Sequence, residues 1–249
     1  MSGETPRGAP PPGERPLPKR FYKEAGVAET GEGMYRVELD GRPVRTPGRN
    51  LLAVPSRPLA EALAGEWAAQ GEVINPLSMP LTRLTNSALD GVEAAREAVA
   101  AEIVRYAGSD LICYRAEGPA RLVARQAEHW DPLLAWARDE FAAVFVLSEG
   151  IRFVDQPESS IEAIARALPT DSLRLAGLNL MTTLSGSALI ALAVWRGYLS
   201  PEAAWQAAHI DELTQEEAWG TDREAMLRRE MRYQDFASAS FYLRLLANC

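Results

Sequence analysis

The side chains of this 249-residue chain that could perform acid–base or metal chemistry are its two histidines. His129 stands two positions before Asp131, and His209 stands two positions before Asp211. A histidine beside a carboxylate can serve as a general base or ligate a metal ion. The spacing matches no established ligand pattern, however, and both histidines have aromatic or aliphatic neighbours. We therefore expect structural histidines, and keep as the alternative a small hydrolase or metal-dependent enzyme that uses His129/Asp131 or His209/Asp211.

Lysine occurs only at Lys19 and Lys23, and every other basic side chain apart from the histidines is an arginine. A P-loop, a protein kinase and a Schiff-base enzyme each need a lysine, so these classes do not fit the rest of the chain. Cys113 and Cys249 suggest neither a zinc site nor a disulfide framework. We expect no catalytic residue, no metal and no cofactor, and a reducing cytoplasm as the location.

The formal net charge is −8, which argues against nucleic-acid binding because such proteins usually carry a basic stripe. Residues 1–19 are rich in proline and have no apolar run, so they predict a disordered tail rather than a signal peptide. Residues 175–195 carry no charge and are just long enough to span a bilayer. Their middle, "TTLSGS", is small and polar. We expect two buried helices that meet there and no stable membrane insertion.

One predicted helix, over residues 201–219, has an unusual face. Trp205, Glu212 and Trp219 are seven residues apart, which on a continuous helix places them on one side, and Gln215 lies close to it. One interpretation is a core stripe of tryptophan with an acid paired to arginine. The other is a carboxylate flanked by aromatic side chains and presented to an arginine-bearing partner. The residues alone leave both open.

The elements around these residues change character along the chain. From residue 20 the pattern is strand-like, and Asp40-Gly41 between alternating apolar and polar residues predicts a hairpin with a type I′ turn. Ser56 can cap a helix with Pro58 in its first turn. Beyond Gly91 the periodicity is almost entirely helical. The predicted fold class is α+β, with a β-rich domain at residues 20–92 followed by an all-helical domain at residues 93–249.

The strip "INPLSMPLTRLTNSALD", residues 74–90, carries one charged side chain, Arg83, before its terminal Asp90. Because it leads from the β-rich part into the helical part, we interpret it as a seam between them. An outer edge at Met79 and Leu81 could extend this seam into a binding surface.

Several segments together resemble a known family. In order they are "FYKEAGV", "LDGRPVRTPGRNLLAVPS", "LAGEWAAQGEVINPLSMPLTRLTNSALD", "DLICYRAEGP", "QAEHWDPLLAW" and "QEEAWG". They look like the signature segments of the assembly chaperones that hold the alpha subunit of F-type ATP synthase in mitochondria and alpha-proteobacteria. The resemblance implies a non-enzymatic chaperone that binds the alpha subunit and prevents its aggregation until beta subunits replace the chaperone. It also implies a β-rich domain plus a helical one, and we expect a monomer.

The resemblance also assigns residues. The residues that match the family's motifs before the last segment are taken as structural: Trp67, Gln70, Arg83, Asn86, Asp90, Gln126, Trp130, Asp131 and Pro132. Glu212, Gln215 and Trp219 match its acidic-Gln-Trp-Gly segment, and with Trp205, Met79 and Leu81 they form the predicted partner-binding set. This chain departs from many relatives in having Leu213-Thr214 before the glutamine and Glu216 after it.

Overall fold

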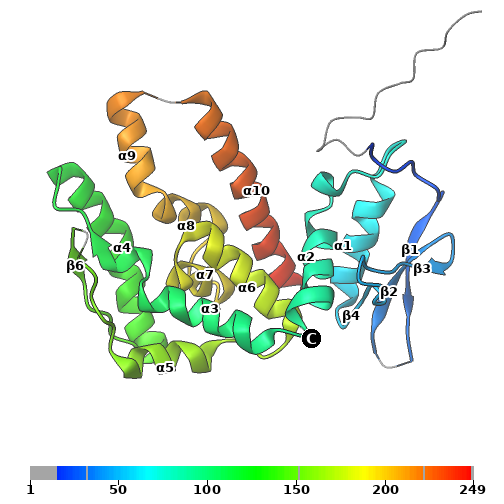
Figure 1. Cartoon of the computed structure of the whole chain (residues 1–249), viewed down its shortest axis with the longest axis horizontal. Coiled ribbons are helices and arrows are strands. Elements are labelled where there is room, and N and C mark those ends of the chain that lie inside the picture. Colours follow the sequence, from blue (N-terminus) through cyan, green and yellow to red (C-terminus); the bar gives the residue numbers. More distant parts are fainter. Residues whose placement is uncertain (1–15, 32, 151, 221, 248–249) are drawn as a thin grey trace, which may run out of the picture.

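The first four strands and the first two helices lie at one end of the molecule, and the remaining helices form a larger assembly at the other (Figure 1). This computed structural model describes residues 16–31, 33–150, 152–220 and 222–247. Most of the predicted disordered tail therefore lies outside the described residues. Its last residues are held, because the carbonyl of Pro18 accepts a hydrogen bond from Ile74 N at 2.8 Å and Lys19 bridges Val73.

A small antiparallel sheet forms from the strand-like segments: β1 Ala25–Glu29, β2 Tyr35–Leu39, β3 Arg42–Pro43 and β4 Ala53–Val54. Strand β2 is central and pairs with each of the other three. The predicted hairpin is confirmed. Asp40 and Gly41 both have positive φ angles, of 49° and 75°, and they close the β2–β3 turn in which Leu39 faces Arg42.

Helix α1, Arg57–Ala68, packs against this sheet. The predicted cap is confirmed, because the Ser56 hydroxyl accepts a hydrogen bond from Leu59 N at 3.2 Å. Leu59 and Leu63 are fully buried beneath the strands. The same Ser56 hydroxyl donates to the carbonyl of Leu245, near the end of the chain. Ser56 therefore joins the start of α1 to the last helix.

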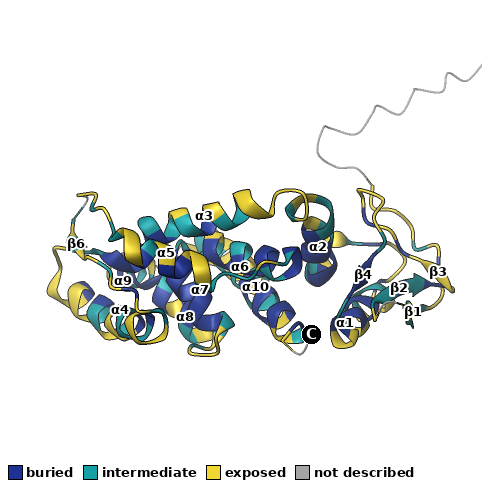
Figure 2. Ribbon diagram, turned by 90° about the horizontal axis from the view of Figure 1, so that it is seen from below, coloured by how far each residue is buried: buried dark blue, intermediate teal, exposed yellow. Residues whose placement is uncertain are grey.

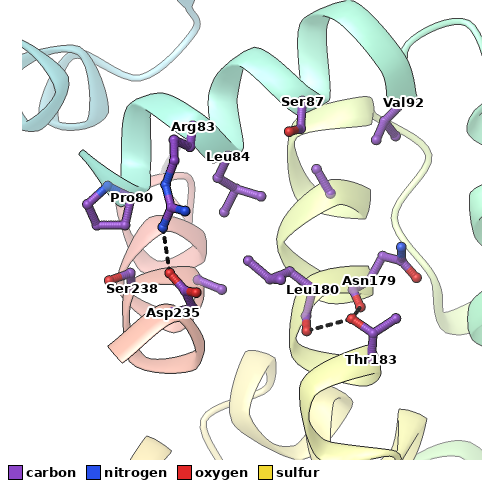
Figure 3. A pocket seen from close by; sticks show the side chains of 12 residues that line it. Pro80, Arg83, Leu84, Ser87, Val92, Asn179, Leu180, Thr183, Asp235 and Ser238 are labelled. Atoms are coloured by element: carbon purple, nitrogen blue, oxygen red, sulfur yellow. Dashed lines mark hydrogen bonds and ion pairs between the residues drawn. The ribbon is translucent and has the colours of Figure 1, made fainter. Parts of the chain in front are cut away.

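The strip at residues 74–90 folds as three short helical elements, the last of which continues to Val92: η1 Pro76–Ser78, α2 Pro80–Ser87 and the π-helical turn η2 Ala88–Val92. Helix α2 lies between α1 on one side and the later helices α6 and α10 on the other. Arg83 reaches across to α10, where its Nη2 lies 2.7 Å from Asp235 Oδ1 (Figure 3). The strip thus packs between the two groups of elements.

The rest of the chain is mostly helical. The helices are α3 Arg96–Gly108, η3 Leu111–Cys113, α4 Ala120–Phe141, α5 Glu158–Ala167, α6 Ser172–Ser185, α7 Ala188–Trp195, α8 Pro201–Ala208, α9 Ile210–Trp219 and α10 Arg223–Leu245. Two short strands, β5 Tyr114–Arg115 and β6 Ser148–Glu149, pair in parallel within this part. The expectation of an all-helical second part is wrong in that detail. The fold is a mixed α+β one, and the division near residue 92 stays a prediction.

The uncharged stretch at residues 175–195 forms two helices, as predicted, with Gly186 between them at a φ of +72°. Gly186 supplies the left-handed cap that ends α6, and the Ser187 hydroxyl accepts a hydrogen bond from Ile190 N to start α7. Within the part of the chain that the structure describes, no helix combines the length and hydropathy needed to cross a bilayer.

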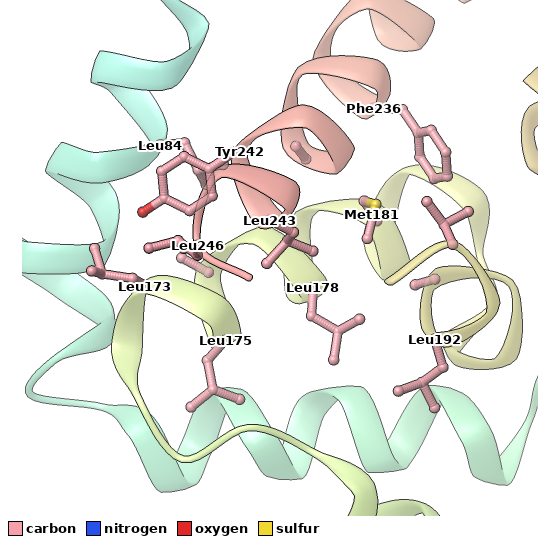
Figure 4. Close-up of a cluster of buried hydrophobic side chains, with 14 of the residues drawn as sticks. Leu84, Leu173, Leu175, Leu178, Met181, Leu192, Phe236, Tyr242, Leu243 and Leu246 are labelled. Carbon is pink, nitrogen blue, oxygen red and sulfur yellow. The ribbon is translucent and has the colours of Figure 1, made fainter. Parts of the chain in front are cut away.

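The core runs through the middle of the molecule, with buried positions on the inward faces of α6, α7 and α10 (Figure 2). Leu178 and Met181 of α6 and Tyr242 and Leu243 of α10 meet in one cluster (Figure 4). Gly177 allows this close approach, because a Cβ there would lie 2.9 Å from Leu243. The sheet, the strip and the helical assembly therefore share a continuous apolar core.

Candidate functional site

The predicted helix at residues 201–219 is in fact two helices. The chain turns at His209, with φ −122° and ψ 23°, so α8 and α9 run in different directions. The seven-residue spacing therefore does not place Trp205 on the face of Glu212 and Trp219. Trp205 is 8% exposed and packs against His209, Tyr233 and Phe236. Its assignment as a partner-binding residue is wrong, because its indole belongs to the core.

On α9 itself, three predicted residues keep a common side. Glu212, Gln215 and Trp219 follow one another at helical spacings of three and four, and all are exposed to solvent. Trp219 is 89% exposed at the end of the helix. A tryptophan so exposed is unusual in a monomer and marks a candidate contact surface. The core-stripe interpretation is wrong for this part of the helix, and presentation to an arginine-bearing partner stays a prediction.

The opposite side of α9 is attached to α4. Gln126 Nε2 donates a hydrogen bond of 2.7 Å to Asp211 Oδ1, and Arg125 Nη1 contacts Thr214 Oγ1 at 3.2 Å. Arg125 Nη1 also forms an ion pair with Glu217 Oε1 at 3.0 Å. Because these contacts occupy the α4 side, the side with Glu212, Gln215 and Trp219 is left for solvent.

A bidentate ion pair also joins helix α9 to α10. Arg229 donates to both carboxylate oxygens of Glu216, at 2.5 and 2.7 Å, and this arginine lowers the pKa of the Glu216 carboxyl below its usual range. Glu212, one turn earlier, makes no hydrogen bond or ion pair with the residues that the structure describes. Glu212 is exposed and interacts with Arg229 and His209 only through Coulombic attraction, so its carboxylate oxygens can still accept hydrogen bonds from an outside cation.

The N-terminal half of α10 adds apolar side chains to this region. Met226, Leu227 and Met231 are all more than two-fifths exposed, and Met231 is 64% exposed. Figure 1 shows α9 and this half of α10 rising together beyond the body of the molecule. We define the tip surface as Glu212, Gln215, Trp219, Met226, Leu227 and Met231. It combines exposed apolar groups with an unpaired acid, a composition suited to protein contact.

The three α10 members of the tip surface were missed by the sequence analysis. Met226, Leu227 and Met231 lie on a helix crowded with arginine and glutamate, where apolar residues are normally taken as core. Their spacing could have indicated exposure, because they do not lie on the same face of the helix as Phe236, which is buried.

Met79 and Leu81 do not offer an outer edge. They are 2% and 6% exposed, and both belong to the core. Met79 immediately precedes α2, whose first backbone N–H groups at Leu81 and Thr82 donate to the Glu66 carboxylate at 2.8 Å each. This capping by α1 draws the start of α2 inward. The expectation that these two side chains reach a binding surface is wrong, since tertiary packing covers them.

Comparison with known proteins gives the family. A model described as the ATP12 chaperone protein matches residues 19–138. A crystal structure of a candidate chaperone from Agrobacterium tumefaciens is 47% identical, with a TM-score of 0.91, covering 94% of this chain and 88% of that chain. Atp12 from Paracoccus denitrificans is 39% identical, with a TM-score of 0.87, covering 92% of this chain and 98% of that chain. The chain belongs to the ATP12 chaperone family.

A second Paracoccus denitrificans Atp12 structure, of a variant in which an aspartate is replaced by lysine, is 38% identical with a TM-score of 0.87. The match covers 92% of this chain and 97% of that chain. This ATP12 family member thus shares its whole fold with those structures. The resemblance seen in the signature segments is confirmed.

The ATP12-type residues Trp67 and Gln70 organise the end of α1. Trp67 is half-buried, with its ring edge-on to Tyr22 at 5.8 Å, and its carbonyl accepts a hydrogen bond from the Tyr22 hydroxyl at 2.7 Å. Gln70 is buried. Its Nε2 donates to Ser78 Oγ at 3.1 Å and its Oε1 accepts from Asn75 N at 2.7 Å. These contacts hold the loop before α2 in place.

Asp90 performs a similar task for the turn after β3. Its carboxylate accepts hydrogen bonds from Gly48 N at 2.7 Å, Asn50 Nδ2 at 2.9 Å and the Thr46 hydroxyl, which together keep the pKa of Asp90 low. A Cβ on Gly48 would lie 2.6 Å from this carboxyl. Asn86, a neighbour on α2, is half-buried. The contacts of Arg83 and Asp90 tie the strip to α10 and to the sheet region.

The predicted structural residues between Gln126 and Pro132 join α4 to neighbouring segments. Gln126 is buried and also accepts a hydrogen bond from Ala116 N at 2.8 Å. Trp130 is 1% exposed, and its Nε1 donates to the carbonyl of Ala207 at 2.8 Å. Asp131 is exposed and pairs with Arg115 at 2.7 Å. Pro132 lies inside α4, and its carbonyl accepts a hydrogen bond from the Tyr198 hydroxyl at 3.4 Å.

The contacts of His209, Asp131 and Asp211 hold helices and loops together. His209 Nδ1 lies 2.9 Å from the carbonyl of Trp205, and burial lowers the pKa of its imidazole. Asp211 is bonded to Gln126, and Asp131 to Arg115. Across the described ranges, no three His, Cys, Asp or Glu side chains gather as a metal site would require. His129 lies in α4 and His209 lies at the junction of α8 and α9, and the contacts within the described residues give them no common partner.

Proposed function

We propose that this ATP12 family chaperone binds the alpha subunit of an F-type ATP synthase and holds it until the alpha subunit assembles with beta. Membership of the ATP12 family supports a chaperone role, and that role implies a protein client. We further propose that the chain acts as a cytoplasmic monomer. No catalytic role for His129 or His209 enters this proposal.

The observation that carries the choice of site is the unpaired Glu212 carboxylate beside the exposed Trp219 on the tip surface. A subunit awaiting its neighbour exposes apolar surface, and an arginine on it would pair with Glu212. Tryptophan supplies a large apolar contact, of the kind enriched among the residues that dominate binding energy. The charge pair would be desolvated as the complex forms.

The test is capture of the alpha subunit from the same organism, measured by size exclusion and by titration. We expect wild type to form a soluble complex and Glu212→Lys to weaken its Kd by about thirtyfold or more, as expected for loss of a desolvated charge pair. Glu140→Lys, at an exposed position of α4, is the matched control and should bind as wild type. Equal capture by Glu212→Lys and wild type would contradict this choice of site, and no complex with wild type would contradict the function.

A further inference from the structure

A separate pocket lies between α2, α6 and α10 (Figure 3). It holds about 320 Å³, and none of its lining residues belongs to α9 or to the tip surface. This is close to the lower end of the roughly 300–1,000 Å³ that small-molecule sites occupy. The pocket is therefore sized for one amino-acid side chain with its adjoining backbone, rather than for a nucleotide or a larger cofactor.

The walls of this pocket are apolar where a side chain would sit. Leu84 comes from α2, Val92 from η2, and Ala176 and Leu180 from α6. Figure 3 shows Leu84 and Leu180 pointing toward one another from opposite sides. A Leu or Met side chain placed between them would exchange water for aliphatic contact, which is favourable in proportion to the apolar area covered.

One end of the pocket carries a half-satisfied ion pair. Arg83 Nη2 bonds to Asp235 Oδ1 at 2.7 Å, and the two side chains are 40% and 39% exposed. Within the described part of the chain, Arg83 Nη1 and Asp235 Oδ2 have no hydrogen-bond partner. The rim thus offers one N–H donor and one carboxylate acceptor side by side, with opposite charges that offset one another.

That arrangement complements a peptide amide. A backbone carbonyl can accept from Arg83 Nη1 while a backbone N–H donates to Asp235 Oδ2. A free carboxylate or phosphate suits the rim less well, because Asp235 would repel it. A peptide that places an aliphatic side chain between Leu84 and Leu180 can therefore satisfy both halves of the rim at once.

We propose that this pocket is a peptide-anchor site, which takes one aliphatic side chain of the bound client and pairs the adjoining backbone amide with Arg83 and Asp235. The inference rests on the proposed function for the identity of the client. It gives the strip at residues 74–90 two uses: Met79 and Leu81 face the core, and Pro80, Arg83 and Leu84 line the pocket.

A first experiment needs no client. N-acetyl-leucine methylamide, titrated into methyl-labelled full-length protein, should shift the methyl resonances of Leu84, Val92 and Leu180 with a saturable, millimolar Kd. N-acetyl-glycine methylamide, which lacks the side chain, should bind at least tenfold more weakly. Ser87→Trp places an indole at the exposed rim and should abolish the shifts. No saturable shift with the leucine probe would overturn the proposal.

A second experiment tests whether the pocket contributes to binding of the client. Ser87→Trp should weaken capture of the alpha subunit tenfold or more at unchanged Tm. Ala101→Trp, which adds an indole to an exposed position of α3, should capture as wild type. Arg83→Lys keeps a cation beside Asp235 but removes the free Nη1, and should cost about fivefold, the equivalent of one hydrogen bond.

The outcomes separate the two hypotheses. If wild type captures no alpha subunit while the leucine probe binds, the proposed function fails and the pocket still accepts peptide. If Ser87→Trp and Arg83→Lys both capture the alpha subunit as wild type does, the peptide-anchor site is wrong even though the chaperone function stands.

Discussion

Gln126 and Asp211, 85 positions apart, are joined by a hydrogen bond of 2.7 Å from the glutamine amide to the aspartate carboxylate. The bond fastens α9 to α4. The same glutamine also accepts from Ala116 N at 2.8 Å, so its amide and carbonyl are both used and its orientation is set by these partners. The side of α9 with Glu212 and Trp219 owes its exposure to this attachment.

Gln126→Glu tests that attachment with almost no change in shape. The new carboxylate can still accept from Ala116 N, but it cannot donate to Asp211 and would lie beside a like charge in a buried place. We expect a loss of about 2–3 kcal/mol in the free energy of unfolding at pH 7. The loss should shrink as the pH falls and one carboxyl of the pair is protonated. Urea denaturation at several pH values measures this, and a pH-independent loss equal to that of Gln126→Met would contradict it.

Glu212 and Glu216, one turn apart on α9, should respond differently to charge reversal. Glu212→Lys should lower the Tm less than Glu216→Lys does, because Glu212 makes no hydrogen bond or ion pair with the described residues and interacts with His209 and Arg229 only through Coulombic attraction. Glu216→Lys should lower the Tm, because it leaves Arg229 facing a like charge in place of its two-pronged partner. Thermal unfolding of both variants decides the matter. The reverse order of Tm values would show that Glu212 is the structural acid.

Two helical glycines should respond in opposite directions to alanine. Gly177→Ala in α6 should destabilise the protein by about 1–3 kcal/mol, because the added methyl would lie 2.9 Å from Leu243. Gly65→Ala in α1 meets nothing within 4 Å and should stabilise by about 0.5–1 kcal/mol through helix propensity. Chemical denaturation of both variants is the measurement. Stabilisation by Gly177→Ala would mean that α6 and α10 are not packed at this distance.

The buried imidazole of His209 predicts a loss of stability at mildly acidic pH. Burial lowers its folded-state pKa below the ordinary value of 6.5, so the unfolded chain binds a proton first as the pH falls. The stability it contributes is present above pH 6.5 and is lost as the pH falls toward the lowered pKa. His209→Gln keeps a donor for the carbonyl of Trp205 but does not titrate. We expect a smaller drop in unfolding free energy between pH 7.5 and 5.5 for this variant, and an equal drop would contradict the assignment.

Local features were determined by the sequence itself. Asp40-Gly41 predicts the hairpin turn because few other residue pairs adopt two consecutive positive φ angles. Ser56 caps α1, and Gly186 ends α6, for reasons that involve only a few neighbouring residues. The signature segments, taken in order, also identified the family, since several linked motifs are far more specific than any one of them.

Only the tertiary structure decided which side chains face solvent. The periodicity of residues 201–219 favours one helix, but the chain turns at His209. The buried imidazole of His209 packs against the Trp205 ring and is hydrogen-bonded to the Trp205 carbonyl. Met79 is buried because α1 and the helical assembly enclose the strip, and Met231 is exposed although its neighbours Arg232 and Tyr233 contact α6 and α8. Such outcomes depend on contacts between residues far apart in the chain, whose free energies local spacing does not contain.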